Sequence, residues 1–581
     1  MLVYGDVTRE EAVGAGLERL DTALRDLTGR TPGLDRHAAL VGAFLDAAGL
    51  AQGLADAACE AAGGREVADP AQDAALALVS ALARAVWASW RSGFAAVPAP
   101  DPGLLAGLAR TRLPSTVAVR LPEGHAFYAV YPEGYAAAAL ASGLPASTRV
   151  VGLRSIGVSL GAMVAAGLGA RPPLTVRPTG HPFARHLNLS PAIRERMLAP
   201  ADGYAVADEG PGLSGSSFGT VADVLEDRGV APDRVAFFPS HGGMPGTRAS
   251  ERHRARWSRA ARHWIGFDEL ILDAALPAHR LDRWAADLLG PLDGPLDDLS
   301  GGAWRRHRVA GAAWPATCAW QERRKFRLAA GGRTWLLKFA GIGREGERKL
   351  ARARALAEAG FTPKVAGFLH GFLAEAWHGE ARPLDPARIG PDALAARVGH
   401  YLGFRTRSFP AAGQGASLDR LVEMARHNAG AALGAGAARW FDRWTAADLR
   451  RLSAVARPVE TDNRMQVWEW LLLPDGTILK TDAVDHHAAH DLVGCQDIAW
   501  DVAGAEIELG LPPARVGAHL ARAAGRPHDP ALLDLLRPCY LAFHLGAAAM
   551  AADGAEPAEA QRLTDAANCY AARLTALAEG R

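Results

Sequence analysis

Two adjacent carboxylates follow an apolar run in VADEGPGLSGSS, residues 206–217. After Asp208 and Glu209 comes a loop of glycine, proline and serine, and the next residues, FGTVADVLEDRG, have the apolar spacing of a helix. A loop that enters a helix presents unpaired backbone N–H groups, which bind anions, whereas two acids suit ribose hydroxyls or Mg²⁺. The pattern indicates a sugar-phosphate site. The alternative is an ordinary Gly/Ser turn beside acids that cap the helix.

The segment from about 113 to 245 resembles the type I phosphoribosyltransferases, whose ribose-phosphate motif has an apolar strand, two acids, a short loop and a Thr/Ser-Gly-x-Thr/Ser turn. The resemblance implies that Asp208 and Glu209 are catalytic residues that face the ribose hydroxyls of phosphoribosyl pyrophosphate (PRPP) or a ribose 5-phosphate. It also implies a 5′-phosphate held by Gly212, Ser214, Gly215, Ser216 and Ser217. The spacer after the acids is about one residue longer than in the family, which weakens the case for pyrophosphate chemistry.

Two neighbouring segments extend this resemblance. VVGLRSIG is similar to the family's strand and pyrophosphate loop, so Arg154 and Ser155 are candidates for binding the diphosphate. VRPTGHPFARH occupies the place of the mobile loop and offers Arg177, His181 and Arg185 as further donors.

A second set of ionisable residues lies in the last third of the chain. Lys338 ends an apolar strand, and the helix that follows offers Glu345 and Glu347 for an ion pair that would fix the lysine over nucleotide phosphates. A lone strand lysine is otherwise an edge residue. Asp462 and Asp482 are about twenty residues apart, across a hairpin that turns on PDG.

Residues 305 to 581 resemble the aminoglycoside-phosphotransferase-like kinases. The resemblance rests on TPKVAGFLHGFLAEAWHGEARPL, which is similar to two strands, a hinge and G-x-P-L, and on GCQDIAWDVAG, which is similar to G-D-P-A-x-D-L-A and contains Asp497 and Asp501. It implies ATP and Mg²⁺ as cofactors. It also implies that Asp462 orients or deprotonates the acceptor hydroxyl, that Asp482 binds Mg²⁺, and that Lys338 steadies the phosphates.

The motif around Asp462 departs from the family pattern. Glu460 stands where the family has histidine, and Val467 stands where it has asparagine, which leaves Asn463 or Gln466 as substitute metal ligands. Asp485, His486 and His487 crowd the position of Asp482, and such a set could instead ligate a transition metal.

The elements that must position these residues follow from periodicity. Residues 8–95 have helical spacing, and alternating strands and helices from about 113 to 245 predict a parallel α/β sheet with ligands at the carboxyl ends of its strands. His241, after one of these strands, either lines the same crevice or is a turn histidine. We therefore expect an α/β multidomain protein with a helical cap (1–100), a phosphoribosyltransferase-like domain (101–250), a helical connector and linker (251–304) and a two-lobed kinase-like domain (305–581).

Composition bounds the partners. The chain has 581 residues, 64 basic against 63 acidic, which disfavours a nucleic-acid coat or an electrostatic membrane binder. Five cysteines without CxxC spacing indicate neither a zinc ribbon nor a disulfide framework. No signal pattern and no apolar run near ~20 residues is evident. We expect a soluble, cytoplasmic protein with a small-molecule, nucleoside-like substrate and no nucleic-acid or membrane partner, and oligomerisation is left open.

Together these features predict a bifunctional transferase for a nucleoside-like or ribosylated small molecule, with an ATP/Mg²⁺-dependent hydroxyl phosphorylation site and a PRPP-type site. The alternative is a nucleotide-sensing regulatory or defence protein in which one or both sites are not catalytic. The lengthened spacer and the residues at Glu460 and Val467 favour that alternative.

Overall fold

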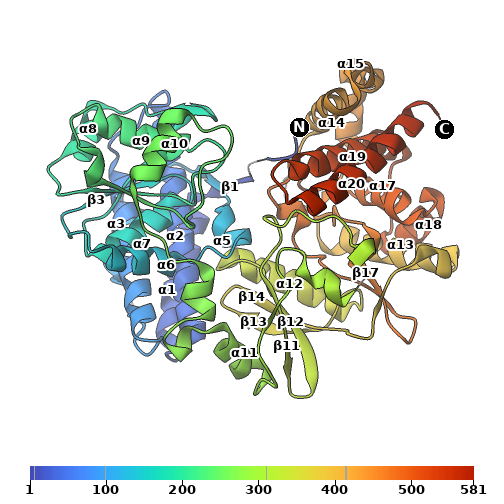
Figure 1. Ribbon diagram of the computed structural model, residues 1–581, viewed down its shortest axis with the longest axis horizontal. Coiled ribbons are helices and arrows are strands. Elements are labelled where there is room, and N and C mark those ends of the chain that lie inside the picture. The colour runs from blue at the N-terminus through green and yellow to red at the C-terminus, as the bar shows by residue number, and fades with distance from the viewer. Residues whose placement is uncertain (6, 99, 309–310, 412–414, 581) are drawn as a thin grey trace.

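A computed structural model describes residues 1–5, 7–98, 100–308, 311–411 and 415–580. Two halves lie side by side (Figure 1). Residues up to about 290 build helices around a parallel sheet, and the rest builds an antiparallel sheet followed by a helical lobe. The protein is therefore of mixed α/β type and contains the expected parallel sheet.

The N-terminal helices pack their apolar faces on one another and on the parallel-sheet domain. They are α1 (Val13–Gly29), α2 (Leu34–Ala61), α3 (Pro70–Arg91) and α4 (Pro102–Ala109). Asp69 begins α3 by accepting hydrogen bonds from the first N–H groups of that helix, and Pro70 sets its first turn. A strand pair lies beside the helices, in which β1 (Thr8–Ala12) is antiparallel to β2 (Thr116–Arg120).

The parallel sheet has the order β4-β3-β7-β8-β9, and every neighbouring pair in it is parallel. Its strands are β3 (Arg149–Leu153), β4 (Leu174–Val176), β7 (Tyr204–Ala207), β8 (Val235–Phe238) and β9 (Ala261–Arg262). The central strands are buried along their length because helices cover both faces of the sheet. The fifth strand lies beyond residue 250, so this domain extends past the boundary that we expected.

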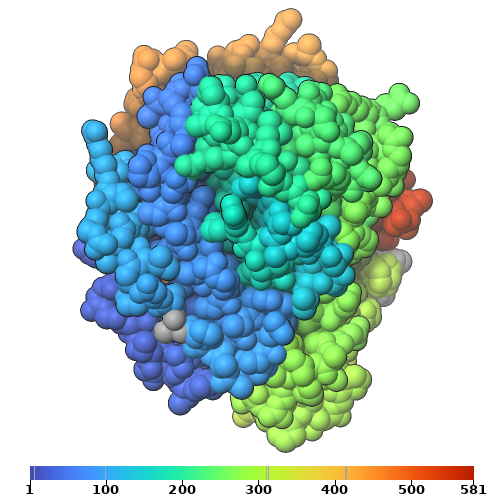
Figure 2. All heavy atoms as spheres, turned by 90° about the vertical axis from the view of Figure 1, so that its left-hand side faces the viewer, coloured from blue at the N-terminus to red at the C-terminus, as the bar shows by residue number. Residues whose placement is uncertain are grey.

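Helices and a hairpin surround this sheet. The helices are α5 (Glu123–Phe127), α6 (Pro132–Ser142), α7 (Gly157–Leu168), α8 (Pro191–Leu198), α9 (Ser216–Glu226) and α10 (Glu251–Arg259). The segment expected as a mobile loop forms the hairpin of β5 (Thr179–His181) and β6 (Ala184–His186). Figure 2 faces this half of the molecule, and its surface is hollowed between the N-terminal helices (blue) and the parallel-sheet domain (cyan to green).

The second sheet is antiparallel, with the order β10-β11-β12-β14-β13. Its strands are β10 (Asp297–Asp298), β11 (Lys325–Ala330), β12 (Arg333–Phe339), β13 (Val365–Leu369) and β14 (Phe372–Ala376), and α12 (Arg344–Glu358) follows β12. Helix α11 (Leu281–Leu289) packs on β13. The segment 289–302, expected as a linker, thus contributes a strand to this sheet.

The helical lobe surrounds short strands that carry the loops of interest. Its helices are α13 (Pro391–Ser408), α14 (Leu418–Leu433), α15 (Ala435–Ala438), α16 (Ala446–Val455), α17 (Ala499–Leu509), α18 (Pro513–Ala524), α19 (Pro530–Ala552) and α20 (Pro557–Ala578). Its strands are β15 (Arg382–Pro383), β16 (Pro458–Val459), β17 (Trp470–Leu472), β18 (Ile478–Lys480) and β19 (Gln496–Asp497). Strands β17 and β18 form the expected hairpin.

Two helices have the length and apolar composition to cross a membrane, α2 with 28 residues and α19 with 23. Our sequence reading, which found no apolar run of that length, missed both. In each helix 67% of the most apolar window is buried inside the protein. Core helices of soluble proteins pass the same test, so it is weak evidence for a membrane span.

Candidate functional site

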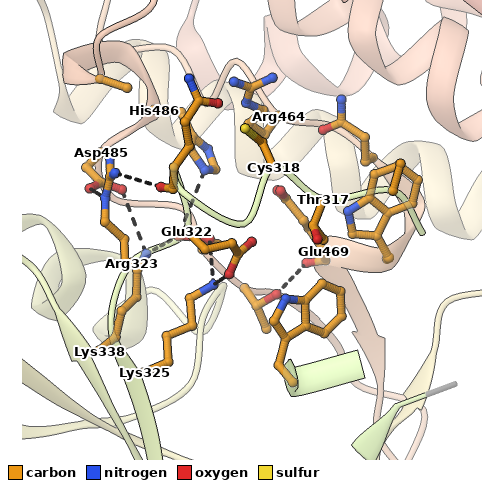
Figure 3. A pocket seen from close by; sticks show the side chains of 18 of the residues that line it. Thr317, Cys318, Glu322, Arg323, Lys325, Lys338, Arg464, Glu469, Asp485 and His486 are labelled. Carbon is orange, nitrogen blue, oxygen red and sulfur yellow. Dashed lines mark hydrogen bonds and ion pairs between the residues drawn. The ribbon is translucent and has the colours of Figure 1, made fainter. Parts of the chain in front are cut away.

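A cavity of about 340 Å³ lies between the antiparallel sheet and the helical lobe. Ionisable side chains from both sides line it, namely Lys325, Lys338, Glu375, Glu469, Asp482, Asp485 and His486. In Figure 3, Lys325 and Lys338 extend from the sheet towards Glu322, Asp485 and His486. The segment that precedes β11 covers the cavity with Thr317, Cys318 and Arg323.

Lys338 spans the cavity from β12 and forms an ion pair with Asp482, which follows β18. A second carboxylate oxygen, on Asp485, lies 3.8 Å from the lysine nitrogen. Burial acts to lower the pKa of Lys338, but the Asp482 and Asp485 carboxylates outweigh it and hold the pKa above its usual value. The lysine is therefore a fixed positive charge at the cavity wall.

The expected partners of Lys338 on α12 lie elsewhere, which corrects the sequence prediction. Glu347 is exposed, and Glu345 pairs with Arg9 and with Arg348. The reason is the rotation of α12, which turns Lys349 inwards so that its nitrogen lies 3.1 Å from Asp485. Carboxylates from the helical lobe therefore fix Lys338, and no glutamate of α12 does so.

Asp462 lies behind the cavity wall, and its side chain has no exposed surface. Its carboxylate accepts a hydrogen bond from the Tyr401 hydroxyl and lies 3.4 Å from the Lys480 nitrogen. His486 lies between Asp462 and the cavity, with its Nδ1 atom 3.1 Å from the Asp462 carbonyl and 3.4 Å from the carboxylate. This differs from the expectation that Asp462 meets the acceptor hydroxyl directly, because the loop after β18 places His486 in front of it.

Gln466 lines the cavity, is buried, and has a side-chain oxygen that finds no partner among the described residues. An open buried oxygen is costly unless a ligand or water meets it. Asp482 lines the same cavity, and its carboxylate is an oxygen ligand of the kind that Mg²⁺ prefers. Asn463, the other substitute, donates its amide to the Gly494 carbonyl and also has an unpartnered side-chain oxygen, but it does not line the cavity. The residues present thus fit a Mg²⁺ ion held by Asp482 and Gln466.

The two aspartates in GCQDIAWDVAG support the loop rather than the cavity. Asp501 accepts hydrogen bonds from the backbone N–H groups of Asp462 and Asn463, at 2.8 and 2.9 Å. Asp497 accepts from the N–H of Ala499 at the start of α17. His487 is buried beside Glu460, so of the two histidines only His486 lines the cavity.

Several cavity residues escaped sequence reasoning. Lys325 stands opposite Lys338 in the β11–β12 register, and the Gly331-Gly332 turn that sets this register was visible in the sequence. Glu375, near the end of β14, is half-buried in the field of Lys338, and loss of solvation raises its pKa to about 7. Glu469 contacts Lys480 at 2.5 Å. No spacing in the sequence pointed to these two acids.

The predicted phosphate cradle assembles at the carboxyl edge of the parallel sheet. Arg154, Arg177 and Asp208 follow the neighbouring strands β3, β4 and β7. Burial raises the pKa of Asp208 to about 7 and that of Glu209 to about 8. The Glu209 carboxylate accepts a hydrogen bond from the Gly124 N–H at 3.0 Å.

Two arginines of this edge are neutralised by acids from the N-terminal helical region. The Arg154 guanidinium binds Asp56 at 2.9 Å and Glu66 at 2.5 Å, and Arg177 binds Asp56 at 2.7 Å. Ser155 accepts from Arg177 at 3.3 Å. The positive charge that we expected to bind a phosphate group is thus paired with acids of another domain. This corrects the expected roles of Arg154 and Arg177.

The serines of the cradle contact the β5–β6 hairpin. Ser214 and Ser216 both donate to the Pro182 carbonyl at its tip, at 3.1 and 2.9 Å. Gly212 and Gly215 adopt φ of +56° and +62° to shape the loop, and Ser217 lies in the first turn of α9.

The remaining predicted donors lie around the same edge. Arg185 donates to the Pro178 carbonyl at 3.1 Å and, with Arg177, acts to lower the pKa of Asp208 against the effect of burial. His181 is exposed on β5. His241 is exposed and lies beside Gly210, since a Cβ atom on that glycine would lie 2.9 Å from its Nε2 atom.

No protein-family model matches this sequence, and no curated protein is similar to it. Among solved structures, the choline kinase LicA from Streptococcus pneumoniae is 12% identical and matches 43% of this chain and 89% of its own, with a TM-score of 0.31. A choline/ethanolamine kinase family protein from Mesorhizobium loti is 17% identical and matches 51% of this chain and 92% of its own, with a TM-score of 0.33. A spectinomycin phosphotransferase in complex with ADP and spectinomycin is 12% identical and matches 50% of this chain and 92% of its own, with a TM-score of 0.31. Similarity at this level carries no argument about activity.

Proposed function

We propose that the inter-lobe cavity is an ATP-dependent phosphotransferase site that phosphorylates a hydroxyl group of a small molecule. The observation that carries the proposal is the Lys338–Asp482 ion pair, which joins the two lobes at the wall of a cavity that the open oxygen of Gln466 also lines. A fixed ammonium group suits the phosphates of a nucleotide. Mg²⁺ held by Asp482 and Gln466 would neutralise charge on those phosphates.

In this site His486 faces the acceptor and Asp462 positions it. The acceptor oxygen attacks the terminal phosphorus, the bond to the ADP oxygen breaks, and the hydroxyl proton passes to Nε2 of His486. Nδ1 of His486 donates to Asp462, which fixes the ring. Lys338 and Lys325 stabilise the charge that moves from the terminal phosphate to ADP.

Phosphorus NMR of the purified protein with Mg²⁺, ATP and a small-molecule cell extract tests the activity. We expect extract-dependent formation of ADP and a new phosphorus signal, and loss of both in Asp482→Asn. If ATP persists with every extract although the protein is folded and binds nucleotide, the sensing alternative replaces the enzyme.

A pair of substitutions tests the two roles. His486→Gln should lower turnover by about 100-fold or more, as expected for a lost general base, while nucleotide affinity stays unchanged. Asp462→Asn should lower turnover less and shift the pH dependence, because His486 keeps its place but loses its anionic partner. If both variants lose the same amount of turnover and their pH profiles are unaltered, Asp462 and not His486 is the general base.

We also infer, as a second candidate, a ribose 5-phosphate site at the carboxyl edge of the parallel sheet. The supporting observation is that Asp208, Glu209 and the amino end of α9 meet at one edge under the β5–β6 hairpin. The acceptor of the kinase reaction would then be nucleoside-like, in a bifunctional transferase. Calorimetric titration with ribose 5-phosphate and PRPP tests this. Binding that Asp208→Asn abolishes supports it, and no binding to folded protein removes it.

A further inference from the structure

Three buried side chains from three parts of the chain meet outside both candidate sites. They are His37 of α2, Glu133 of α6 and His370 in the turn between β13 and β14. The Nε2 atom of His37 lies 2.9 Å from Oε1 of Glu133, and Nε2 of His370 lies 3.4 Å from the same oxygen. Neither candidate site uses them.

Two polar atoms of this cluster have no hydrogen-bond partner among the described residues. They are Oε2 of Glu133 and Nε2 of His370, and their side chains are 0% and 1% exposed. An unpaired, buried carboxylate oxygen costs several kcal/mol unless an ion or a hydrogen-bond donor meets it. Glu133 and His370 face each other in this cluster, so a single ligand could bind to both residues.

The donor set and its spacing fit a tetrahedral transition-metal ion. The three ligand atoms lie within 4.8 Å of one another, and a zinc ion with bonds of about 2.0–2.1 Å places its ligands about 3.3 Å apart. The rings of His37 and His370 converge with their centroids 5.2 Å apart and their planes at 68°. Two imidazoles and a carboxylate are ligands that Zn²⁺ accepts, whereas Mg²⁺ prefers oxygen alone.

The surroundings hold the histidine in the form that binds metal. Nδ1 of His37 hydrogen-bonds Ser89 at 2.9 Å, which leaves Nε2 to face the cluster. A third histidine nearby, His279, has its Nε2 atom on the Trp90 carbonyl at 2.8 Å and is stacked on that indole, so it is not a ligand.

We propose that His37, Glu133 and His370 bind one Zn²⁺ ion that joins the N-terminal helices, the parallel-sheet domain and the antiparallel sheet. The fourth position would hold water, or the second oxygen of Glu133. The site is structural because its ligands are fully buried and the Tyr131 hydroxyl already ties the His370 turn to the parallel-sheet domain at 2.7 Å. This inference does not depend on the proposed kinase activity.

Metal analysis of the full chain tests the site. The protein is produced without a histidine tag, in medium supplemented with zinc, and is dialysed against metal-free buffer. Mass spectrometry of its metal content should give about one zinc per chain. The double variant Glu133→Gln/His370→Ala should lose this zinc, and a strong chelator should lower the melting temperature of the wild type but leave that of the double variant unchanged.

A matched variant distinguishes the kinase cavity from this cluster, because Asp482, Asp485 and His486 could also hold a metal. Asp482→Asn/His486→Gln should keep the zinc. Loss of zinc from this variant, or folded wild-type protein without zinc, would overturn the proposal. If the double variant does not fold, Co²⁺ replaces zinc in the wild type. Absorption bands of tetrahedral Co²⁺ that persist in Asp482→Asn/His486→Gln would support the site, and their absence would overturn it.

Discussion

The ammonium group of Lys338 is buried at the cavity wall and is held by two carboxylates of the opposite lobe. Lys325, its neighbour across the register, instead contacts Glu322 at 2.7 Å and lies 3.9 Å from Asp482. The two lysines therefore differ in their ion pairs although they face the same space. In the proposed reaction, Lys338 would set the phosphate position and Lys325 would add charge.

Lys338→Met should lower ATP turnover by at least about 100-fold, the scale seen when one preorganised charge is removed from a transition state. It should also lower the melting temperature, since Asp482 and Asp485 lose a partner. Turnover of ATP and thermal unfolding check both effects. The exposed Lys364→Met in the same lobe is the control and should change neither. Turnover within a few-fold of wild type would contradict the proposed role.

Asp208 and Glu209 make stability depend on pH. Burial raises their folded-state pKa values to about 7 and about 8, so between about pH 4 and 8 the folded protein keeps protons that the unfolded chain releases. The free energy of unfolding therefore falls as pH rises through this range. Asp208→Asn/Glu209→Gln should remove this slope and gain several kcal/mol over wild type at pH 8 relative to pH 5, at about 1.4 kcal/mol for each pH unit and carboxyl. Urea midpoints at both pH values check this, and parallel profiles would contradict it.

At the scale of elements, the segment between β10 and β11 closes the cavity. Arg305 binds Glu559 of α20 at 3.0 Å and the Gly302 and Pro315 carbonyls at 2.8 and 2.7 Å. Arg308 donates to the His378 carbonyl at 2.7 Å and lies 4.0 Å over the Trp377 ring. The segment thus bridges the helical lobe and the end of the antiparallel sheet.

Arg305→Ala should loosen this cover, because the Glu559 carboxylate and two carbonyls lose their donor together. We expect trypsin to cut between residues 299 and 324 at least about ten-fold faster, with the rest of the fold intact. Mass spectrometry of the fragments locates the cut. Arg306→Ala is the control, since Arg306 is exposed and pairs with Asp297. Equal rates in the two variants would show that Arg305 does not hold the cover.

Helix α5 lies between the two candidate sites. Its Gly124 N–H binds Glu209, its Glu123 carboxylate pairs with His490 at the inter-lobe cavity, and Tyr128, directly after it, lines that cavity. Lys349 donates to the Ala126 carbonyl at 2.9 Å and pairs with Asp485. One short helix is thus in direct contact with side chains of both sites.

At the scale of the whole molecule, the hydrophobic cores do not follow the domain boundaries. One core runs from Val13 through Tyr131 and Leu270 to Phe339 and Phe372, so the helices, the parallel sheet and the antiparallel sheet share it. A second core fills the helical lobe and includes Val3. The first residues of the chain cross to that lobe, where Leu2 binds Asn428 at 2.7 Å and the Leu492 N–H donates to the Val3 carbonyl at 2.9 Å.

Val3→Asp should therefore destabilise the helical lobe, although residue 3 is about 460 residues from Asp462 in the sequence. Val3 is 2% exposed, and burying an unpaired carboxylate there should cost about 3 kcal/mol. The unfolding midpoint measured by Trp fluorescence checks this. Val455→Asp, at an exposed position of the same lobe, should change little. A Val3→Asp midpoint equal to that of wild type would mean that the first residues of the chain do not pack on the helical lobe in solution.

The sequence by itself determined the local elements and the residues that they carry. Alternation of strands and helices predicted the parallel sheet, the PDG turn predicted the β17–β18 hairpin, and the Gly-Gly turn placed Lys338 on a strand. These depend on periodicity and turn chemistry, which act over a few residues. Lys338, Asp482, Asp208 and Glu209 were visible for the same reason, whereas Lys325, Glu375 and Glu469 were not.

Only the tertiary structure decided which of these residues meet. The rotation of α12 turns Lys349 inwards in place of Glu347. His486 lies in front of Asp462 at the cavity. Asp56 and Glu66 form ion pairs with Arg154, which follows a strand of the parallel sheet. The cluster of His37, Glu133 and His370 joins residues more than 300 positions apart. Such pairings depend on how helix faces pack and on long-range burial, and no local pattern in a single sequence encodes them.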